Sequence, residues 1–119
     1  MVGYQLKRTK NCGELRSSNV GDEVSLSGWV NSFRNLGGLI FMDLRDREGL
    51  SQAVIDPRET PDLATRAREI REESVVSVRG AVRLRPETMI NRDMPTGEVE
   101  VLVSELVVEN RSEPMPFHL

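Results

Sequence analysis

Residues 74–85 read SVVSVRGAVRLR, and they decide the fold. Apolar residues and one glycine occupy every second position, and a period of two predicts a β-strand with one buried face. The inward positions are expected to be Val76, Val78, Gly80, Val82 and Leu84, and the outward ones Val75, Ser77, Arg79, Ala81, Arg83 and Arg85. A strand of this kind needs partners, so the neighbouring sequence is expected to supply a sheet.

The same alternation recurs on both sides of a turn-prone stretch. Residues 24–32 read VSLSGWVNS and residues 39–45 read LIFMDLR, with NLGG at 35–38 between them. Gly49 can take a positive φ and is expected to fold the second of these strands back onto residues 50–56. Three consecutive strands joined by hairpins are therefore predicted.

A helix is expected after the third strand, starting at Thr60-Pro61, where a hydroxyl can cap free amides and a proline suits the first helical position. Its narrow apolar stripe, which runs through about residue 73, consists of Leu63, Ala67 and Ile70. A last strand over about 98–108 loses its alternation halfway, which predicts a bulge or a change of register. Five strands with one helix between the third and fourth is the order of an all-β OB-fold, a small closed Greek-key barrel.

Composition excludes several classes of protein. The 119 residues suit one domain. The sequence has no apolar run of about 18 residues and no signal peptide. We therefore expect a cytoplasmic location and no membrane partner. The single cysteine and single histidine cannot make a disulfide framework or a zinc site. Cys12 is expected to be an inert thiol and His118 to be solvated.

Charge and motifs favour recognition over catalysis. The net charge of −3 argues against a general polycation, but only two of the sixteen basic residues are lysines, and arginine favours planar, bidentate contacts. No nucleophile with a base, no phosphate-binding loop and no set of metal ligands is legible, so this domain is predicted to be non-catalytic, with no cofactor or metal of its own.

The outward positions form a candidate binding face, because Phe41, Gln52, Arg83, Arg85 and Glu100 all avoid the predicted barrel interior. An aromatic ring can stack on an unpaired base at about 1 to 3 kcal/mol, while an amide and a carboxylate read base edges and arginine holds phosphate or a base. This combination suits single-stranded RNA better than duplex DNA.

Each of these residues also has a purely structural interpretation. Phe41 can be packed under a loop or the N-terminal segment, and Arg34 and the other arginines can be solvated surface charges. Gln52 and Glu100 can be ordinary residues of a strand surface. Trp29 is expected to pack against the N-terminal segment rather than to stack on a base.

Several motifs resemble the N-terminal anticodon-binding domain of bacterial-type aspartyl-tRNA synthetase, a class II enzyme. They are CGELR at 12–16, GWVN at 28–31, RNLGGLIFMDLRDREG at 34–49, NRDMPTGEVEV at 91–101 and PMPF at 114–117. The resemblance implies an OB-fold domain over residues 1–112 and the start of a hinge at 113–119, leading to a catalytic domain that uses ATP and Mg²⁺. It also implies the anticodon loop of aspartate tRNA as partner and a homodimer for the full-length enzyme.

The resemblance implies a role for each of four residues. Phe41 would stack on the central anticodon uridine, Gln52 would hydrogen-bond it, Glu100 would read the first base, and Arg34, in the loop between the first two strands, would contact the second and third bases. One departure matters, because Ser32-Phe33 stands where the family commonly carries arginines. Either phosphate affinity is weaker here, or Phe33 adds a stacking surface.

Three alternatives stay open from the sequence. The equivalent domains of lysyl- and asparaginyl-tRNA synthetases share the fold and read the same central uridine. A free-standing OB domain could bind single-stranded RNA or a protein without any enzyme attached. Whether the parent enzyme would serve asparagine tRNA as well as aspartate tRNA is also undecided.

Overall fold

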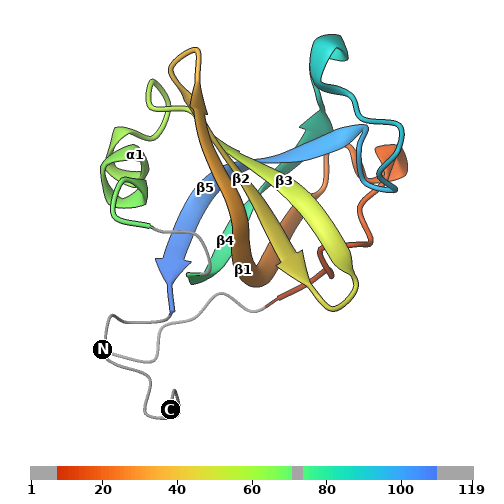
Figure 1. Cartoon of the computed structure of the whole chain (residues 1–119), viewed down its shortest axis with the longest axis horizontal. Helices are drawn as coiled ribbons and strands as arrows, with labels where there is room; N and C mark the ends of the chain where they lie inside the picture. Colours follow the sequence, from red (N-terminus) through yellow and green to blue (C-terminus); the bar gives the residue numbers. More distant parts are fainter. Residues whose placement is uncertain (1–7, 71–73, 110–119) are drawn as a thin grey trace.

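The computed structural model describes residues 8–70 and 74–109, and within them it confirms the predicted OB-fold (Figure 1). Five strands close into a barrel in the order β1-β2-β3-β5-β4. Neighbouring strands are antiparallel except for β3 and β5, which run parallel. The elements are η1 (Ser17–Asn19), β1 (Glu23–Leu36), β2 (Leu39–Asp46), β3 (Gly49–Ile55), α1 (Pro61–Ala67), β4 (Val75–Leu84), η2 (Glu87–Met89) and β5 (Val99–Val108).

The first hairpin is tighter than predicted. Gly37 and Gly38 both have positive φ, 58° and 84°, and make a two-residue turn of the kind whose twist matches the flanking strands. β1 therefore continues to Leu36 instead of ending near residue 32. The placement of Arg34 in a loop is wrong, because it lies on β1 opposite Phe41 of β2. Gly49 has the predicted positive φ, 148°, at the second hairpin.

The barrel interior follows the predicted alternation. Val76, Val78 and Val82 of β4 are buried in the core with alternate residues of the other strands. The bulge expected in the last strand is confirmed: Arg79 pairs with Glu105 but Gly80 pairs with Val103, which leaves Ser104 as the extra residue. This change of parity lets both Val103 and Leu106 face the core.

The alternation fails at the end of β4, where two assignments are wrong. Leu84, predicted inward, is 56% exposed, and Arg85, predicted outward, is 6% exposed. β4 ends at Leu84, so the chain leaves the barrel here and the next side chain turns toward the loop at 86–97.

The helix is shorter than predicted, because α1 ends at Ala67 and the chain then tightens into bonds between residues three apart, among them Ile70 N–H to the Ala67 carbonyl at 3.0 Å. The three stripe residues Leu63, Ala67 and Ile70 are buried as expected. Thr60 does not cap free amides; its hydroxyl donates to the Asp56 carbonyl at 3.3 Å. Among the described residues, no helix has the length and apolarity needed to cross a membrane.

Cys12 fastens the N-terminal segment to the barrel and is buried, as an inert thiol should be. Its N–H donates to Asp46 Oδ2 at 2.8 Å, and its carbonyl accepts from the Ser51 hydroxyl. Burial, assisted by the neighbouring Asp46 carboxylate, raises the pKa of the Cys12 thiol to about 12.

The first prediction concerns the closest approach of β4 and β5. A Cβ added at Gly80 would lie 2.0 Å from the Leu102 carbonyl oxygen, so Gly80→Ala must push the two strands apart. We expect a loss of about 1 to 3 kcal/mol in the free energy of unfolding, measured by urea titration. Ala81→Ser, at the exposed neighbouring position, should change it by less than about 0.5 kcal/mol. Equal effects of the two substitutions would contradict a close strand contact at Gly80.

The second prediction concerns the Cys12 thiol. Because its pKa in the folded state lies near 12 against an ordinary 9.0, the folded protein holds the proton that the unfolded chain releases above about pH 9. Stability should therefore fall as pH rises from about 9 to 12. At pH 8 a thiol reagent should label the protein only on the timescale of unfolding, as followed by mass spectrometry with and without urea. Rapid labelling of the folded protein would contradict the burial of this group.

Candidate nucleic-acid interface

One row of polar side chains crosses the outward faces of all five strands. The strand register places Ser32 beside Asp43, Asp43 beside Gln52, Gln52 beside Glu100, and Glu100 beside Arg83. The polar row, as we name it, comprises these five residues and Arg34, which reaches into it from β1. Barrel closure thus brings together residues distant in the sequence, among them Gln52 and Glu100, which are 48 positions apart.

The centre of the polar row is a buried amide and carboxylate. Gln52 Nε2 donates to Glu100 Oε1 at 2.8 Å, and Arg83 Nε donates to Glu100 Oε2 at 2.8 Å. Arg34 Nη2 donates to Gln52 Oε1 at 3.2 Å. A guanidinium only donates and a carboxylate only accepts, so the two neighbours fix which way the Gln52 amide points.

Arg34 is held at the other end of the polar row. Its Nη1 donates to Asp43 Oδ2 at 3.0 Å and to Ser32 Oγ at 3.3 Å, and the Ser32 hydroxyl itself donates to Asp43 Oδ2 at 2.6 Å. The guanidinium carbon lies 5.9 Å from the centroid of the Phe41 ring, near the outer limit of a cation–π contact.

Four predicted site residues, Phe41, Gln52, Arg83 and Glu100, do lie outside the barrel interior, but three of them are not on open surface. Phe41 is 4% exposed, Gln52 2% and Glu100 1%. The side chains of Arg34 and Arg83, which contact them, are more than a third exposed. The side chains of Arg34 and Arg83 are therefore more exposed than the amide and the carboxylate that they contact.

Arg85 departs from its predicted position on the outward face. Its Nε donates to the Val99 carbonyl at 2.9 Å and its Nη1 to the Met89 carbonyl at 3.3 Å, which ties the loop at 86–97 to β5. Its buried Nη2 has no partner among the described residues. Burial lowers the pKa of Arg85, while the Asp43 and Glu100 carboxylates act in the opposite direction. Arg85 therefore lies beside the polar row without bonding to it.

Two members of the polar row, Ser32 and Asp43, were not predicted as site residues. The alternation of β2 does put Asp43 on the same face as Phe41, and this parity was the available signal. Its contact with Arg34 depends on the extension of β1 to Leu36, which the alternation did not predict.

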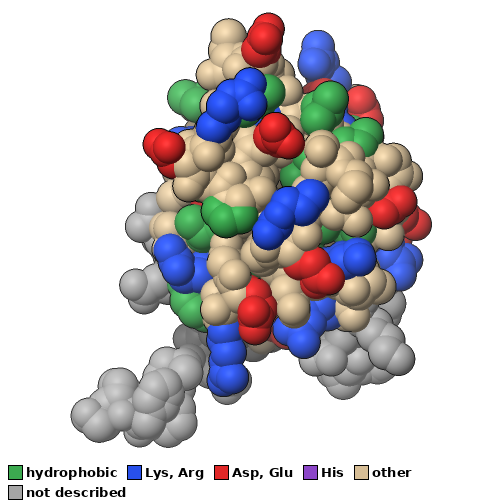
Figure 2. Space-filling model, turned by 90° about the vertical axis from the view of Figure 1, so that its right-hand side faces the viewer, with side chains coloured by type: hydrophobic (Ala, Val, Ile, Leu, Met, Phe, Trp, Pro, Cys, Tyr) green, Lys and Arg blue, Asp and Glu red, His purple; other side chains and the backbone are tan. Residues whose placement is uncertain are grey.

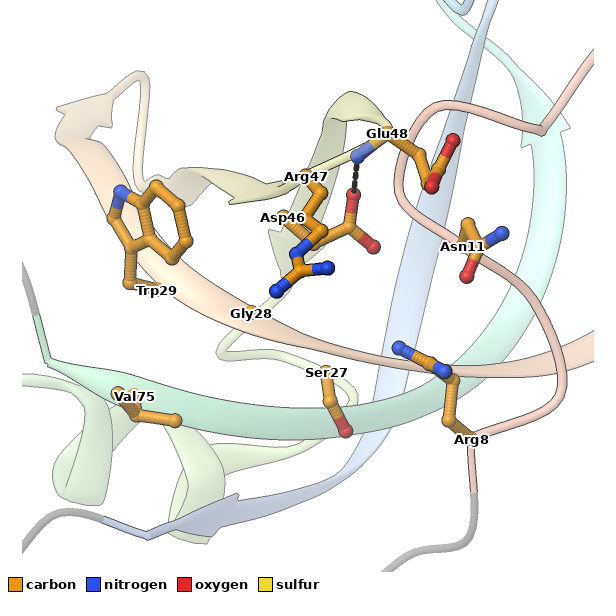
Figure 3. A pocket seen from close by; sticks show the side chains of 9 residues that line it. All are labelled: Arg8, Asn11, Ser27, Gly28, Trp29, Asp46, Arg47, Glu48 and Val75. Carbon is orange, nitrogen blue, oxygen red and sulfur yellow. Dashed lines mark hydrogen bonds between the residues drawn. The ribbon is translucent and has the colours of Figure 1, made fainter.

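Trp29 lies away from the polar row and is 40% exposed. It lines a pocket of about 490 Å³ together with Arg8, Asn11 and Asp46 (Figure 3). The Asp46 side chain accepts a hydrogen bond from the Glu48 N–H. Of the N-terminal segment against which Trp29 was expected to pack, residues 1–7 lie outside the described residues, as do His118 and the predicted hinge at 113–119.

Charge is mixed on one face of the molecule. On the face seen in Figure 2, basic and acidic side chains are interspersed rather than gathered by sign. Such a surface gives little long-range attraction for a polyanion, so specific contacts must carry recognition. In the described part of the chain, no group of three or more His, Cys, Asp or Glu side chains is arranged to hold a metal ion.

Comparison with known proteins agrees with this geometry. Residues 24–109, which contain the whole polar row, match the family model named for the tRNA anticodon and described as an OB-fold nucleic acid binding domain. The chain belongs to this OB-fold family.

Curated relatives confirm the resemblance expected from the sequence. This OB domain is 52% identical over 113 residues to the aspartate--tRNA(Asp/Asn) ligase of Geotalea uraniireducens, and 48% identical over 114 residues to that of Dictyoglomus turgidum. The alignments cover 95% and 96% of this chain but only 19% of each ligase.

Solved structures share the barrel. The asparaginyl-tRNA synthetase from Pyrococcus horikoshii superposes with a TM-score of 0.74 at 29% identity, over 92% of this chain and 24% of that one. The OBody AM1L10, solved bound to hen egg-white lysozyme, superposes with a TM-score of 0.76 at 26% identity, over 92% of this chain and 98% of its own.

The third prediction concerns Arg85 as an anchor of the loop at 86–97. Arg85→Ala removes two bonds to carbonyls and a buried stem, and should lower the free energy of unfolding by about 2 kcal/mol. Amide hydrogen exchange within the loop should accelerate. Arg92→Ala is the matched control, because that exposed arginine of the same loop only pairs with Glu98 at 3.6 Å and should matter by less than about 0.5 kcal/mol. Equal effects would contradict the anchoring role.

Proposed function

We propose that this domain binds the anticodon loop of aspartate tRNA and reads its bases at the polar row. The observation that carries the proposal is the continuous hydrogen-bonded line from Arg34 through Gln52 and Glu100 to Arg83. The ligases that match almost the whole chain at about 50% identity act on tRNA(Asp/Asn) by their names, which supports this choice of RNA.

Gln52 is suited to a uracil edge because its bonds in the polar row leave part of the amide free. The amide has two N–H donors and two acceptor positions, and the row uses one of each. The remaining donor and acceptor match the neighbouring carbonyl and N–H on the Watson–Crick edge of uracil. Phe41 is 4% exposed in the free domain, and it supplies the stacking surface for that base once the side chains that bury the ring move aside.

Glu100 is suited to a base edge that donates. Its carboxylate accepts and cannot donate, so it favours the adjacent donors of guanine over a base that presents carbonyls. Arg34 and Arg83 offer only donors and are assigned to acceptors of the second and third bases or to phosphates. Arg85 acts through the loop that it anchors.

The activity of the whole protein is also a proposal, because the chain spans 19% of the length of these ligases. A cytoplasmic, homodimeric enzyme would join aspartate to tRNA with ATP and Mg²⁺ in a further catalytic domain. Among the described residues, no three or more His, Cys, Asp or Glu side chains are arranged to hold a metal ion, and we assign ATP and Mg²⁺ to the catalytic domain. We propose binding alone for the isolated domain.

The fourth prediction separates stacking from base reading. Phe41→Ala should weaken binding of an anticodon stem-loop by about 1 to 3 kcal/mol whatever base occupies the central position, since a ring stacks on any base. Gln52→Ala should reduce the preference for uridine at the central position, and Glu100→Gln the preference at the first position. The measurement is a titration by fluorescence anisotropy at two salt concentrations, with each anticodon base varied in turn.

The control for this series is Glu105→Gln. It removes the same negative charge from β5 as Glu100→Gln, but from a surface ion pair with Arg79 at 3.7 Å. Circular dichroism must first establish that every variant is folded. Wild-type base preferences in both Gln52→Ala and Glu100→Gln would refute the proposed function and leave a general single-strand or protein-binding module.

A further inference from the structure

We propose that Asp43 is a positioning residue for base recognition, which acts by holding Arg34 against Gln52, with Ser32 as its helper. This inference rests on the proposed function, since it concerns how the same polar row is kept in its reading geometry. Neither Asp43 nor Ser32 is assigned to contact RNA.

The contacts of Asp43 are concentrated on one atom. Oδ2 accepts the Ser32 hydroxyl at 2.6 Å and Arg34 Nη1 at 3.0 Å, and the side chain is only 18% exposed. Charge-assisted bonds at such distances are among the stronger ones in proteins. The only ion pair of Asp43 among the described residues is the one with Arg34. The Asp43 carboxylate also acts electrostatically on the buried guanidinium of Arg85 and favours its charged form.

Arg34 needs this anchor because its side chain is long and 37% exposed. Free arginine side chains carry about 2 kcal/mol of rotamer entropy, so a solvated guanidinium would not stay at one place on the face. Bonds to Ser32, Asp43 and Gln52 pin it across three strands. The same bonds hold its guanidinium carbon over the Phe41 ring, 5.9 Å from the centroid.

The anchor matters most when RNA is bound. In the free protein both Glu100 and Arg34 orient the Gln52 amide. When Glu100 turns to the first anticodon base, the bond from Arg34 Nη2 to Gln52 Oε1 remains to hold the amide with its oxygen on the β1 side. A Gln52 amide free to rotate would match the reversed edge of cytosine as well as that of uracil.

The test exchanges the two side chains that hold Arg34. Asp43→Ser removes the carboxylate, and the double variant Ser32→Asp with Asp43→Ser returns it on β1, where Ser32 Oγ already lies 3.3 Å from Arg34 Nη1. The measured quantity is the ratio of Kd for stem-loops with cytidine and uridine at the central position. We expect Asp43→Ser to lower this ratio at least fivefold and the double variant to recover it to within twofold of wild type.

Three further variants make the outcome decisive. Glu105→Gln removes an equal charge elsewhere and should leave the ratio unchanged. Asp43→Asn keeps the size of the side chain and should also lower the ratio. It replaces Asp43→Ser if circular dichroism shows that Asp43→Ser is unfolded. An unchanged ratio in the folded Asp43 variant, or a folded double variant without recovery, overturns the inference. Gln52→Ala tells the two proposals apart, because an unchanged ratio there refutes the reading of the central base by Gln52, on which the proposed function rests.

Discussion

Closure of the barrel depends on how closely β4 approaches β5 at Gly80. No side chain larger than hydrogen fits there, since the Leu102 carbonyl oxygen occupies the space of a Cβ. The bulge at Ser104 lies beside this contact and lets the remainder of β5 turn Leu106 into the core. β5 also pairs with β3, so it brings residues of β3 and β4 to its two sides.

The polar row is a direct product of that register. Burial of a carboxylate is costly unless hydrogen bonds compensate it, and Glu100 obtains its bonds from β3 on one side and from β4 on the other. A shift of one residue in either pairing would turn Gln52 or Arg83 to the opposite face. The geometry proposed for base recognition and the integrity of the barrel therefore depend on the same strand pairings.

Much of this structure could be predicted from the local sequence. A period of two located four of the five strands and the turn at Gly49 located the third, and the positive φ of Gly49, the bulge in β5 and the buried stripe of the helix were all confirmed. The same alternation correctly placed Phe41, Gln52 and Glu100 outside the barrel interior. The predicted ends of two elements were wrong, since β1 continues to Leu36 and α1 ends at Ala67. Boundaries depend on turns and packing as well as on periodicity.

The sequence by itself determined the order of strands, the inward and outward sets within the strands up to Arg83 of β4, and the residue types available for binding RNA, because the side-chain alternation of a strand is a local property. Only the tertiary structure decided that Asp43 and Ser32 hold Arg34, that arginines donate to Gln52 and Glu100, and that Arg85 is buried beside a loop. These facts depend on register and on packing between residues distant in the chain. Alternation states which face a side chain occupies, whereas barrel closure selects its neighbours.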